Sequence, residues 1–306
     1  MFTGRRIRVI LNPNSGTERG QEYAERISRA ISSSGPAELD LRKTSGPDDA
    51  WTWASEAAEE GFDVVIAAGG DGSVTGVAHG ILKSKQEKRP AVGIIPLGTG
   101  NGLARVLGLP MDPLAAVKTL STGKLVDLDA LDVHSHDATS LLFLGAGLDA
   151  EINRDADSEE KSRLGFMAYV NATFTNMRNR RNHSVRLVVD GEERLIQAHT
   201  ISVFNATRLE LLGAKVGPDA HPHDGYAELS VMSSPGLLGV VGQVLRIVAG
   251  PGGKPELEDI RELEIEARPP MLVHIDGDVV GETPVKLKMV PAALKFIASA
   301  RYQVPD

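Results

Sequence analysis

The chain has 306 residues, of which 33 are lysine or arginine and 41 are aspartate or glutamate, so its formal net charge is −8. This acidic balance argues against bulk nucleic-acid binding, and we expect no nucleic-acid partner. The sequence contains no cysteine, which excludes disulfides, thiolate metal sites and a cysteine nucleophile. Residues 1–11 carry too short an apolar run for a signal peptide, and no apolar stretch is long enough to span a bilayer. We therefore expect a cytoplasmic protein whose contact with membranes is peripheral.

The first part of the chain alternates segments of strand-like and helix-like pattern. In order, these are "RIRVILNP", residues 17–34, "AELDLRKT", residues 48–60, "DVVIAAGG", a helix from Ser73, and "AVGIIPLG". The alternation predicts a Rossmann-like α/β domain with a parallel sheet. Each strand ends in a small or polar turn, so we expect these turns to gather at one edge of the sheet, where such sheets bind ligands.

The pattern changes from "KLVDLDALDV" onward to alternating strands such as "SVRLVVDG", "ELEIEA" and "LVHIDG". These segments predict an antiparallel sheet or a β-rich sandwich, with turns at Asp190-Gly191 and Asp276-Gly277. Helices are expected at residues 157–178 and 235–249. A chain of this length is expected to form two domains.

Three glycine-rich turns carry the chemistry of the first part: "NPNSG" at 12–16, "GGDGSVTG" at 69–76 and "PLGTGNGLAR" at 96–105. Glycine lets backbone N–H groups approach a ligand closely, and a helix N-terminus attracts anionic oxygens. Each turn therefore suits a phosphate. The chain contains neither GxGxxG at the first turn nor GxxxxGK[ST] anywhere, so it uses neither the dinucleotide fingerprint nor a P-loop.

Asp71 lies in the second of these turns, where a carboxylate would repel a phosphate. A lone carboxylate in such a place indicates either Mg²⁺ between it and the phosphates or a role in proton transfer. The alternative is an ordinary strand-to-helix turn in which Asp71 caps the helix. The turn alone leaves both interpretations open.

The order and spacing of the three turns resemble those of the diacylglycerol kinase catalytic family, whose bacterial members and sphingosine kinase relatives are soluble lipid kinases. Later segments are similar too, namely "LVDLDALDV", "GAGLDAEI", "PDAHPHDGYAELSV" and "HIDGDVVGETP". The resemblance implies a nucleotide-binding α/β domain at residues 1–126 and a β-rich lipid-substrate domain at 127–306, with the active site in the cleft between them. It stays open whether the last residues belong to the first domain.

The resemblance also implies which residues bind ATP and Mg²⁺. Asp71 would act through Mg²⁺, and Asp127 would help to organise that ion through water. Contacts to ATP would come from the three turns and from Thr44 after the second strand. The implied cofactor-binding residues are Asn12, Ser15, Gly16, Thr44, Gly69, Gly70, Asp71, Gly72, Ser73, Gly98, Thr99 and Asn101.

The family's general base is placed in an Asp-Gly-Glu turn, and the corresponding residues of this chain are Asp276-Gly277-Asp278. Asp278 is then the candidate base, with a side chain one methylene shorter, so its position must compensate by about 1 Å. Thr75 and Gly76 stand where the family commonly has Asn-Glu, which removes a carboxylate near the acceptor. Both differences keep open a nucleotide-binding regulator with little or no turnover.

The segment "HPHDGY" at 221–226 invites a metal site. The resemblance implies a structural Mg²⁺ held by the Asp224 carboxylate and by the main-chain carbonyls of His221 and Tyr226. Zinc bound by His221 and His223 is a weaker alternative, because zinc sites usually need three or four nitrogen or sulfur ligands. A metal-free Asp-Gly turn is the third alternative.

These features predict an ATP- and Mg²⁺-dependent kinase that phosphorylates a hydroxyl of a diacylglycerol-like or related lipid. Asp71, Asp127 and Asp278 are the candidate catalytic residues. The alternatives are the nucleotide-binding regulator and an NAD-kinase-like enzyme with a non-lipid acceptor, which shares the GGDG turn. The expected partners are ATP and a lipid substrate at the membrane surface, and a homodimer is left open.

Overall fold

The computed structural model describes residues 2–16, 20–147, 183–206, 210–211, 214–215, 220–233 and 257–304. The helices expected at 157–178 and 235–249 lie outside the described residues. The chain divides into two compact units, one formed by Met1–Ala130 with Pro291–Asp306 and the other by Leu131–Val290. Both boundaries fall within long strands, β5 (Lys124–Val133) and β18 (Val285–Ala298).

The first unit is built on a parallel sheet. Its strands β1 (Arg6–Leu11), β2 (Glu38–Lys43), β3 (Val64–Gly69) and β4 (Ala91–Pro96) stand in the order β2-β1-β3-β4. All three neighbouring pairs are parallel. β3 is buried along its whole length, as expected for a central strand that is covered on both faces. The predicted parallel α/β domain is confirmed.

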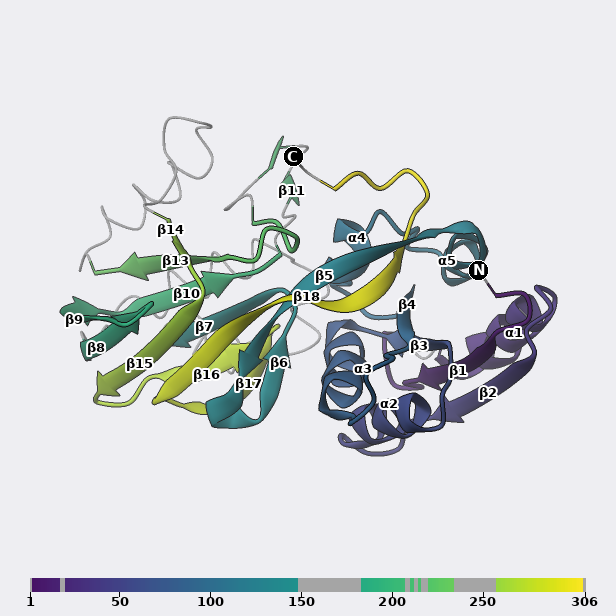
Figure 1. Ribbon diagram of the computed structural model, residues 1–306, viewed down its shortest axis with the longest axis horizontal. Coiled ribbons are helices and arrows are strands. Elements are labelled where there is room, and N and C mark those ends of the chain that lie inside the picture. The colour runs from purple at the N-terminus through teal and green to yellow at the C-terminus, as the bar shows by residue number, and fades with distance from the viewer. Residues whose placement is uncertain are drawn as a thin grey trace. The chain divides into compact units, whose positions relative to one another are not determined.

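Among the described residues of this unit, five helices accompany the sheet: α1 (Gly20–Ser32), α2 (Asp49–Glu59), α3 (Asp71–Lys83), α4 (Gly102–Val106) and α5 (Pro113–Thr122). In Figure 1, α2 lies beside α3, and α1 also packs against α5. Glycine permits the α2–α3 contact, because a Cβ on Gly80 would collide with the backbone of Trp51. α3 begins two residues before the expected Ser73, since the extended Gly70 is its N-cap.

The described part of the second unit consists mainly of strands. They are β6 (Ala138–Ser140), β7 (Phe143–Gly147), β8 (His183–Val189), β9 (Glu192–Ala198), β10 (Thr200–Phe204), β11 (Glu210–Leu211), β12 (Ala214–Lys215), β13 (Ala227–Met232), β14 (Glu258–Ile260), β15 (Glu262–Arg268), β16 (Leu272–Ile275) and β17 (Asp278–Glu282), with a 3-10 turn η1 (His134–His136).

These strands form two main antiparallel layers. One has the order β14-β13-β10-β7-β16-β17, and the other runs from the first part of β18 through β15 and β8 to β9. Alternate residues of the second layer, including Val185, Leu187 and Ile265, are buried in a core that also contains Val203 and Leu229 of the first layer. The β-rich sandwich predicted from the alternating pattern is confirmed.

The two Asp-Gly turns have the geometry expected of two-residue hairpins. Asp190 and Gly191 join β8 to β9, and Asp276 and Gly277 join β16 to β17. All four residues have positive φ, as a type I′ turn requires. In the described ranges, no helix is both long and apolar enough to cross a membrane.

Candidate active site

The glycine-rich turns follow β1, β3 and β4, which are neighbours in the parallel sheet. Parallel strands bring their carboxyl ends to one edge, so the three turns lie together there. The strand order reverses at β1, because β2 lies on one side of it and β3 on the other. Such a reversal separates successive loops and creates the crevice in which α/β sheets bind ligands.

The first turn is held in shape by its own side chains and touches the other two turns. The side-chain oxygen of Asn12 accepts the N–H of Asn14 at 2.9 Å. The hydroxyl of Ser15 accepts the N–H of Gly70, in the second turn, at 3.3 Å. Gly16 has a φ of +75° and packs so closely on the Leu97 carbonyl of the third turn that a Cβ would collide with it.

The second and third turns meet backbone against backbone. A Cβ on Gly98 would lie 2.5 Å from the Cα of Gly70, a collision that glycine at position 98 avoids. Asn101 closes the third turn: its amide donates to the Gly98 carbonyl at 2.6 Å and its oxygen accepts the Gly98 N–H at 3.1 Å. Asn101 is 7% exposed, and its backbone has a positive φ of 51°. Its buried side chain therefore shapes the turn.

Asp71 joins the second turn to the third. It is the first residue of α3, and its Oδ1 accepts the N–H of Leu103 at 3.4 Å. A Cβ on Gly100 would lie 2.9 Å from Oδ2 of Asp71, so the carboxylate rests against that loop. Asp71 thus follows the N-cap residue of its helix, which is Gly70.

The other residues expected around ATP lie on or beside the same turns. The Ser73 hydroxyl is packed against Gly69, where a Cβ would collide with it, and Gly72 and Thr99 are exposed. The N–H of Thr44 donates to the Leu11 carbonyl at 2.8 Å, which places Thr44 just beyond the ends of β1 and β2. Hydrogen bonds from the backbone of Ser45 and Gly46 lower the pKa of the Asp49 carboxyl and tie this loop to α2.

Arg105, the last residue of "PLGTGNGLAR", is a further candidate that was not predicted from the sequence. It is exposed at the end of α4, and its Nε donates to the Gly100 carbonyl at 3.0 Å. A guanidinium anchored to the third turn brings positive charge to the turn that Asp71 also contacts. The sequence feature that could have indicated Arg105 is its position, about one helical turn after a glycine-rich turn.

The residues present fit a nucleotide phosphate and a hard cation. The backbone of Gly70 and Gly98 is free of Cβ atoms where a ligand would approach, and the 13-residue helix α3 begins there without a side-chain cap. Mg²⁺ takes few protein carboxylates and completes its shell with water and phosphate oxygens, so the single carboxylate of Asp71 suits it. Among the described residues, no cluster of three or more His, Asp or Glu side chains forms a self-sufficient metal site.

Asp127 is engaged by a lysine. Its Oδ1 accepts from Nζ of Lys295 at 2.6 Å, and both side chains are about half exposed, at 50% and 56%. Nearby on the same strand, the buried Asp129 accepts the N–H of Ala292 at 2.7 Å. Both contacts join β5 to β18.

Asp276 and Asp278 differ sharply in their surroundings. The Asp276 carboxylate accepts four hydrogen bonds, from the Ser140 hydroxyl and from the N–H groups of Leu141, Leu142 and Phe143, at 2.8 to 3.0 Å. Asp278 begins β17 and is exposed. The turn therefore uses Asp276 to anchor the hairpin and presents Asp278 at the surface of the second unit.

The "HPHDGY" segment forms a tight turn in the second unit. The His223 N–H donates to the His221 carbonyl at 2.8 Å, and the Tyr226 N–H donates to Oδ1 of Asp224 at 2.9 Å. The Tyr226 hydroxyl accepts from Arg261, whose guanidinium lies 4.4 Å from the centre of the ring. Asp224 itself is exposed, so one of its oxygens shapes the turn while the carboxylate faces solvent.

Two family models match the chain. The one described as the diacylglycerol kinase catalytic domain matches residues 6–133. The one described as the YegS C-terminal NAD kinase β-sandwich-like domain matches residues 143–298. Together they cover the glycine turns and, apart from β6, the described strands of the second unit.

Several relatives have similar sequences. A diacylglycerol kinase of Bacillus subtilis (strain 168) is 32% identical over 236 residues, which cover 76% of this chain and 75% of that protein. A diacylglycerol kinase of Staphylococcus saprophyticus is 27% identical over 285 residues, covering 92% and 91%. An uncharacterized Synechocystis protein is 30% identical over 248 residues, and this chain covers 55% of its length.

Solved structures share the fold. A structure from Bacillus anthracis str. Sterne has a TM-score of 0.81 at 24% identity, covering 98% of this chain and 97% of that chain. A second, described as a diacylglycerol kinase of the same organism, has a TM-score of 0.76 at 23% identity, covering 96% and 97%. Because both family models match and the Bacillus subtilis relative is 32% identical with 75% of its length covered, the chain belongs to the diacylglycerol kinase family.

Proposed function

We propose that this chain is an ATP- and Mg²⁺-dependent lipid kinase that transfers the γ-phosphoryl group of ATP to a hydroxyl of a diacylglycerol-like lipid. The observation that carries the proposal is the contact between Gly70 and Gly98, where two turns meet with no side chain between them. Relatives named diacylglycerol kinase support the choice of a kinase and of a lipid acceptor. The acceptor lipid would be reached at a membrane surface, with the protein bound peripherally.

The described residues divide the work between binding and chemistry. The backbone of the three turns would hold the phosphates, and Arg105 would add a positive charge beside the third turn. Mg²⁺, when bound near Asp71 with help from Asp127, would offset the charge that develops on the transferred group. Asp278 would accept the proton of the acceptor hydroxyl, which leaves that oxygen free to attack the phosphorus.

The binding half of the proposal is tested with Gly70→Val. A Cβ at position 70 would already be in van der Waals contact with the Cα of Gly98, at 3.4 Å, so the two further methyl groups of valine would have little room. We expect ATP binding, measured by calorimetry in the presence of Mg²⁺, to be lost while circular dichroism shows a folded chain. Gly46→Ala is the control, because its Cβ would have 3.9 Å to the nearest atom. Unchanged ATP affinity in Gly70→Val would contradict the proposal that the three glycine-rich turns bind ATP.

The chemical half is tested by transfer of labelled phosphate from ATP into a panel of acceptors. The panel contains diacylglycerol and related lipids in mixed micelles, together with NAD as the non-lipid acceptor. Label in a lipid supports the proposal. Label in NAD alone would favour the NAD-kinase-like alternative, for which the description of the second family model is the supporting observation. Tight ATP binding without transfer to any acceptor would favour a nucleotide-binding regulator.

The structural Mg²⁺ at "HPHDGY" also stays a proposal. The Asp224 carboxylate and the carbonyls of His221 and Tyr226 would supply oxygen ligands of the kind that Mg²⁺ prefers. The exposed carboxylate supports it, whereas Arg261 beside Tyr226 brings a competing positive charge. A zinc site built from the histidines has less support, because the described residues contain no cluster of three ligating side chains.

A further inference from the structure

Basic side chains on one face of the second unit are paired with glutamates, and Arg268 is the exception. This face is the side of the layer β18-β15-β8-β9 that points away from the core. Its ion pairs are Lys286–Glu264 at 2.9 Å, Lys288–Glu262 at 3.2 Å and Arg186–Glu193 at 2.7 Å. Arg268 is exposed at the end of β15, and within the described ranges its guanidinium has no hydrogen-bond or ion-pair partner. It is therefore a cation that can bind an external anion.

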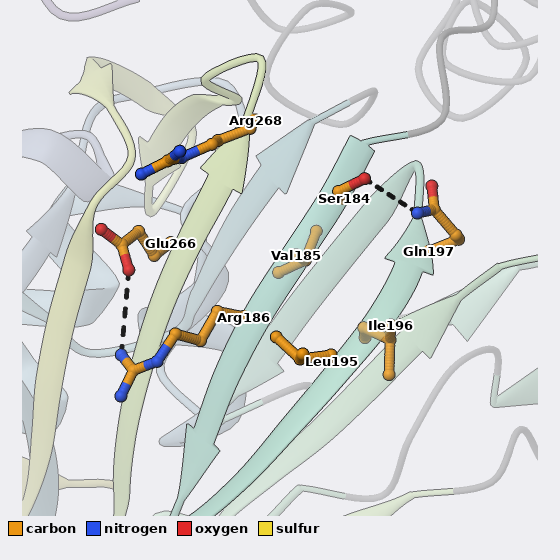
Figure 2. Close-up of a pocket in the computed structure, with 8 residues that line it drawn as sticks. All are labelled: Ser184, Val185, Arg186, Leu195, Ile196, Gln197, Glu266 and Arg268. Carbon is orange, nitrogen blue, oxygen red and sulfur yellow. Dashed lines mark hydrogen bonds and ion pairs between the residues drawn. The ribbon is translucent and has the colours of Figure 1, made fainter.

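Arg268 stands at the rim of a hollow of about 500 Å³ on this face (Figure 2). The strand register sets the side chains that surround it. One row of cross-strand neighbours is Arg268, Ser184 and Gln197, and the next row is Glu266, Arg186 and Leu195. Ser184 has the shortest side chain of this set and lies in the middle of its row. The longer side chains around Ser184 therefore form the walls of the hollow.

The first row presents hydrogen-bond donors. The side-chain amide of Gln197 donates to the Ser184 hydroxyl at 2.8 Å, which leaves the Ser184 O–H able to donate in turn. The guanidinium of Arg268 presents a planar fork of donors that matches the oxygens of a carboxylate or a phosphate. Beside this row, Nδ1 of His183 donates to the Pro269 carbonyl at 2.7 Å and ties β8 to the end of β15. The row is thus a preformed set of donors for an anion.

The second row presents apolar surface with its charges already offset. Leu195 is 78% exposed, the highest fraction among the large apolar side chains described. Arg186, opposite Leu195 on β8, is held by Glu193 at 2.7 Å and lies 3.8 Å from Glu266. An aliphatic group that covered Leu195 would therefore remove apolar surface from water without breaking an ion pair.

We propose that this hollow binds an anionic amphiphile, namely a phosphate or carboxylate group on a short aliphatic chain. The head group would accept hydrogen bonds from Arg268, Ser184 and Gln197, and the chain would cover Leu195. The volume of about 500 Å³ lies within the roughly 300–1,000 Å³ of small-molecule sites. The proposal concerns a face of the second unit and does not depend on the kinase activity proposed above.

The test is an NMR titration of the full chain with octyl phosphate, followed through the backbone amide shifts. Because the contact involves few atoms, we expect a Kd on the order of 1 mM and titrate to about 10 mM. The amides of Ser184, Leu195, Gln197 and Arg268 should shift together. Inorganic phosphate lacks the chain and hexanol lacks the head group, so each should bind about tenfold more weakly. Octanoate compares the two head groups, because it replaces the phosphate by a carboxylate.

Three variants separate the charge of the hollow from its shape. Arg268→Gln should weaken the binding of octyl phosphate by about tenfold, because it removes the charge-assisted hydrogen bonds. Lys288→Gln is the matched control: it removes a cation from the same face but outside the hollow, and it should bind like the wild type. Ser184→Tyr fills the hollow and keeps Arg268, so it should also lose binding. The three positions are exposed, and circular dichroism checks that each variant is folded.

Several results would overturn the proposal. Shifts confined to other parts of the chain, such as the glycine-rich turns, would place the ligand elsewhere. Unchanged affinity in a folded Arg268→Gln protein would exclude the guanidinium as the anion's partner. Equal affinity for octyl phosphate and inorganic phosphate would exclude the contact between the chain and Leu195. Binding to phosphatidylglycerol vesicles without binding of monomeric octyl phosphate would assign this face to a membrane surface instead.

Discussion

Gly98→Ala is the substitution that tests the meeting of the second and third turns most directly. The new Cβ would lie 2.5 Å from the Cα of Gly70, 3.3 Å from its nitrogen and 3.1 Å from Oδ1 of Asn101. Two of these neighbours are backbone atoms and cannot rotate away. The turns must therefore separate by about 1 Å to restore ordinary van der Waals contact.

Two effects of that separation have expected magnitudes. Forcing a methyl group into a close-packed contact costs about 1–3 kcal/mol of unfolding free energy. A displacement of about 1 Å in a group that positions the reacting phosphate lowers turnover by roughly 10²-fold. Because Asn101 bonds both polar groups of the Gly98 backbone, the shift is transmitted to the start of α4.

The assays are urea denaturation for stability, calorimetry for ATP affinity and phosphate transfer for turnover. Gly46→Ala carries the same added methyl group on a neighbouring loop, where the nearest atom is 3.9 Å away, and it should match the wild type in all three. Gly70→Ala, with 3.4 Å to Gly98, should lie between the two. A Gly98→Ala protein that equals Gly46→Ala in stability and ATP affinity would refute the close approach.

Substitutions at four further positions separate the roles of single residues. Asp71→Asn keeps an oxygen for the Leu103 N–H, so unfolding free energy should change by less than about 1 kcal/mol while turnover falls by about 10²-fold; an active variant would contradict this. Asp278→Asn should lower transfer by about 10²-fold with ATP affinity unchanged, and Asp278→Glu should retain or raise it; equal rates would exclude Asp278 as the base. Chelation should lower the melting temperature of the wild type but not of Asp224→Ala, and a response retained in the variant would place the metal elsewhere. Ala292→Gly should raise unfolding free energy by about 1 kcal/mol, because alanine at a φ of +46° is strained, and a lower denaturation midpoint would count against that strain.

The architecture of both units could be predicted from the sequence because its signals are local. The run "VVIAAG" has no polar residue, and the structure buries all of it in a central parallel strand. The Asp-Gly pairs at 190–191 and 276–277 stand between alternating segments, and both form hairpin turns. The position of the glycine turns followed from the same logic, since each comes directly after a strand of a parallel sheet.

Residues whose environment comes from distant segments could not be predicted in this way. Arg8 in "RIRVIL" has the charge of a surface residue, yet it is 1% exposed and bonded to Asp40 and Glu60 at 2.8 and 2.7 Å. In the sequence, Gly76 was interpreted as the place where a carboxylate is missing. In the structure, a Cβ at Gly76 would lie 3.2 Å from the Cβ of Ala50 on α2, so the contact between α2 and α3 favours a small residue. Each assignment depends on a partner more than 20 residues away.

The anchored hairpin bears on the question that the short side chain of Asp278 raises. Asp276 binds the segment 140–143 through four side-chain hydrogen bonds and donates its own N–H to the Phe143 carbonyl at 2.9 Å. A turn held in this way cannot shift by about 1 Å to replace a missing methylene without giving up hydrogen bonds worth about 1 kcal/mol each. If Asp278 is the base, as we propose, the acceptor hydroxyl must approach it more closely than it would approach a glutamate, or transfer must be slow. The Asp278→Glu substitution restores the longer side chain and leaves the hydrogen bonds of Asp276 unchanged. The turnover of this variant distinguishes a site adapted to the aspartate from one that has lost turnover.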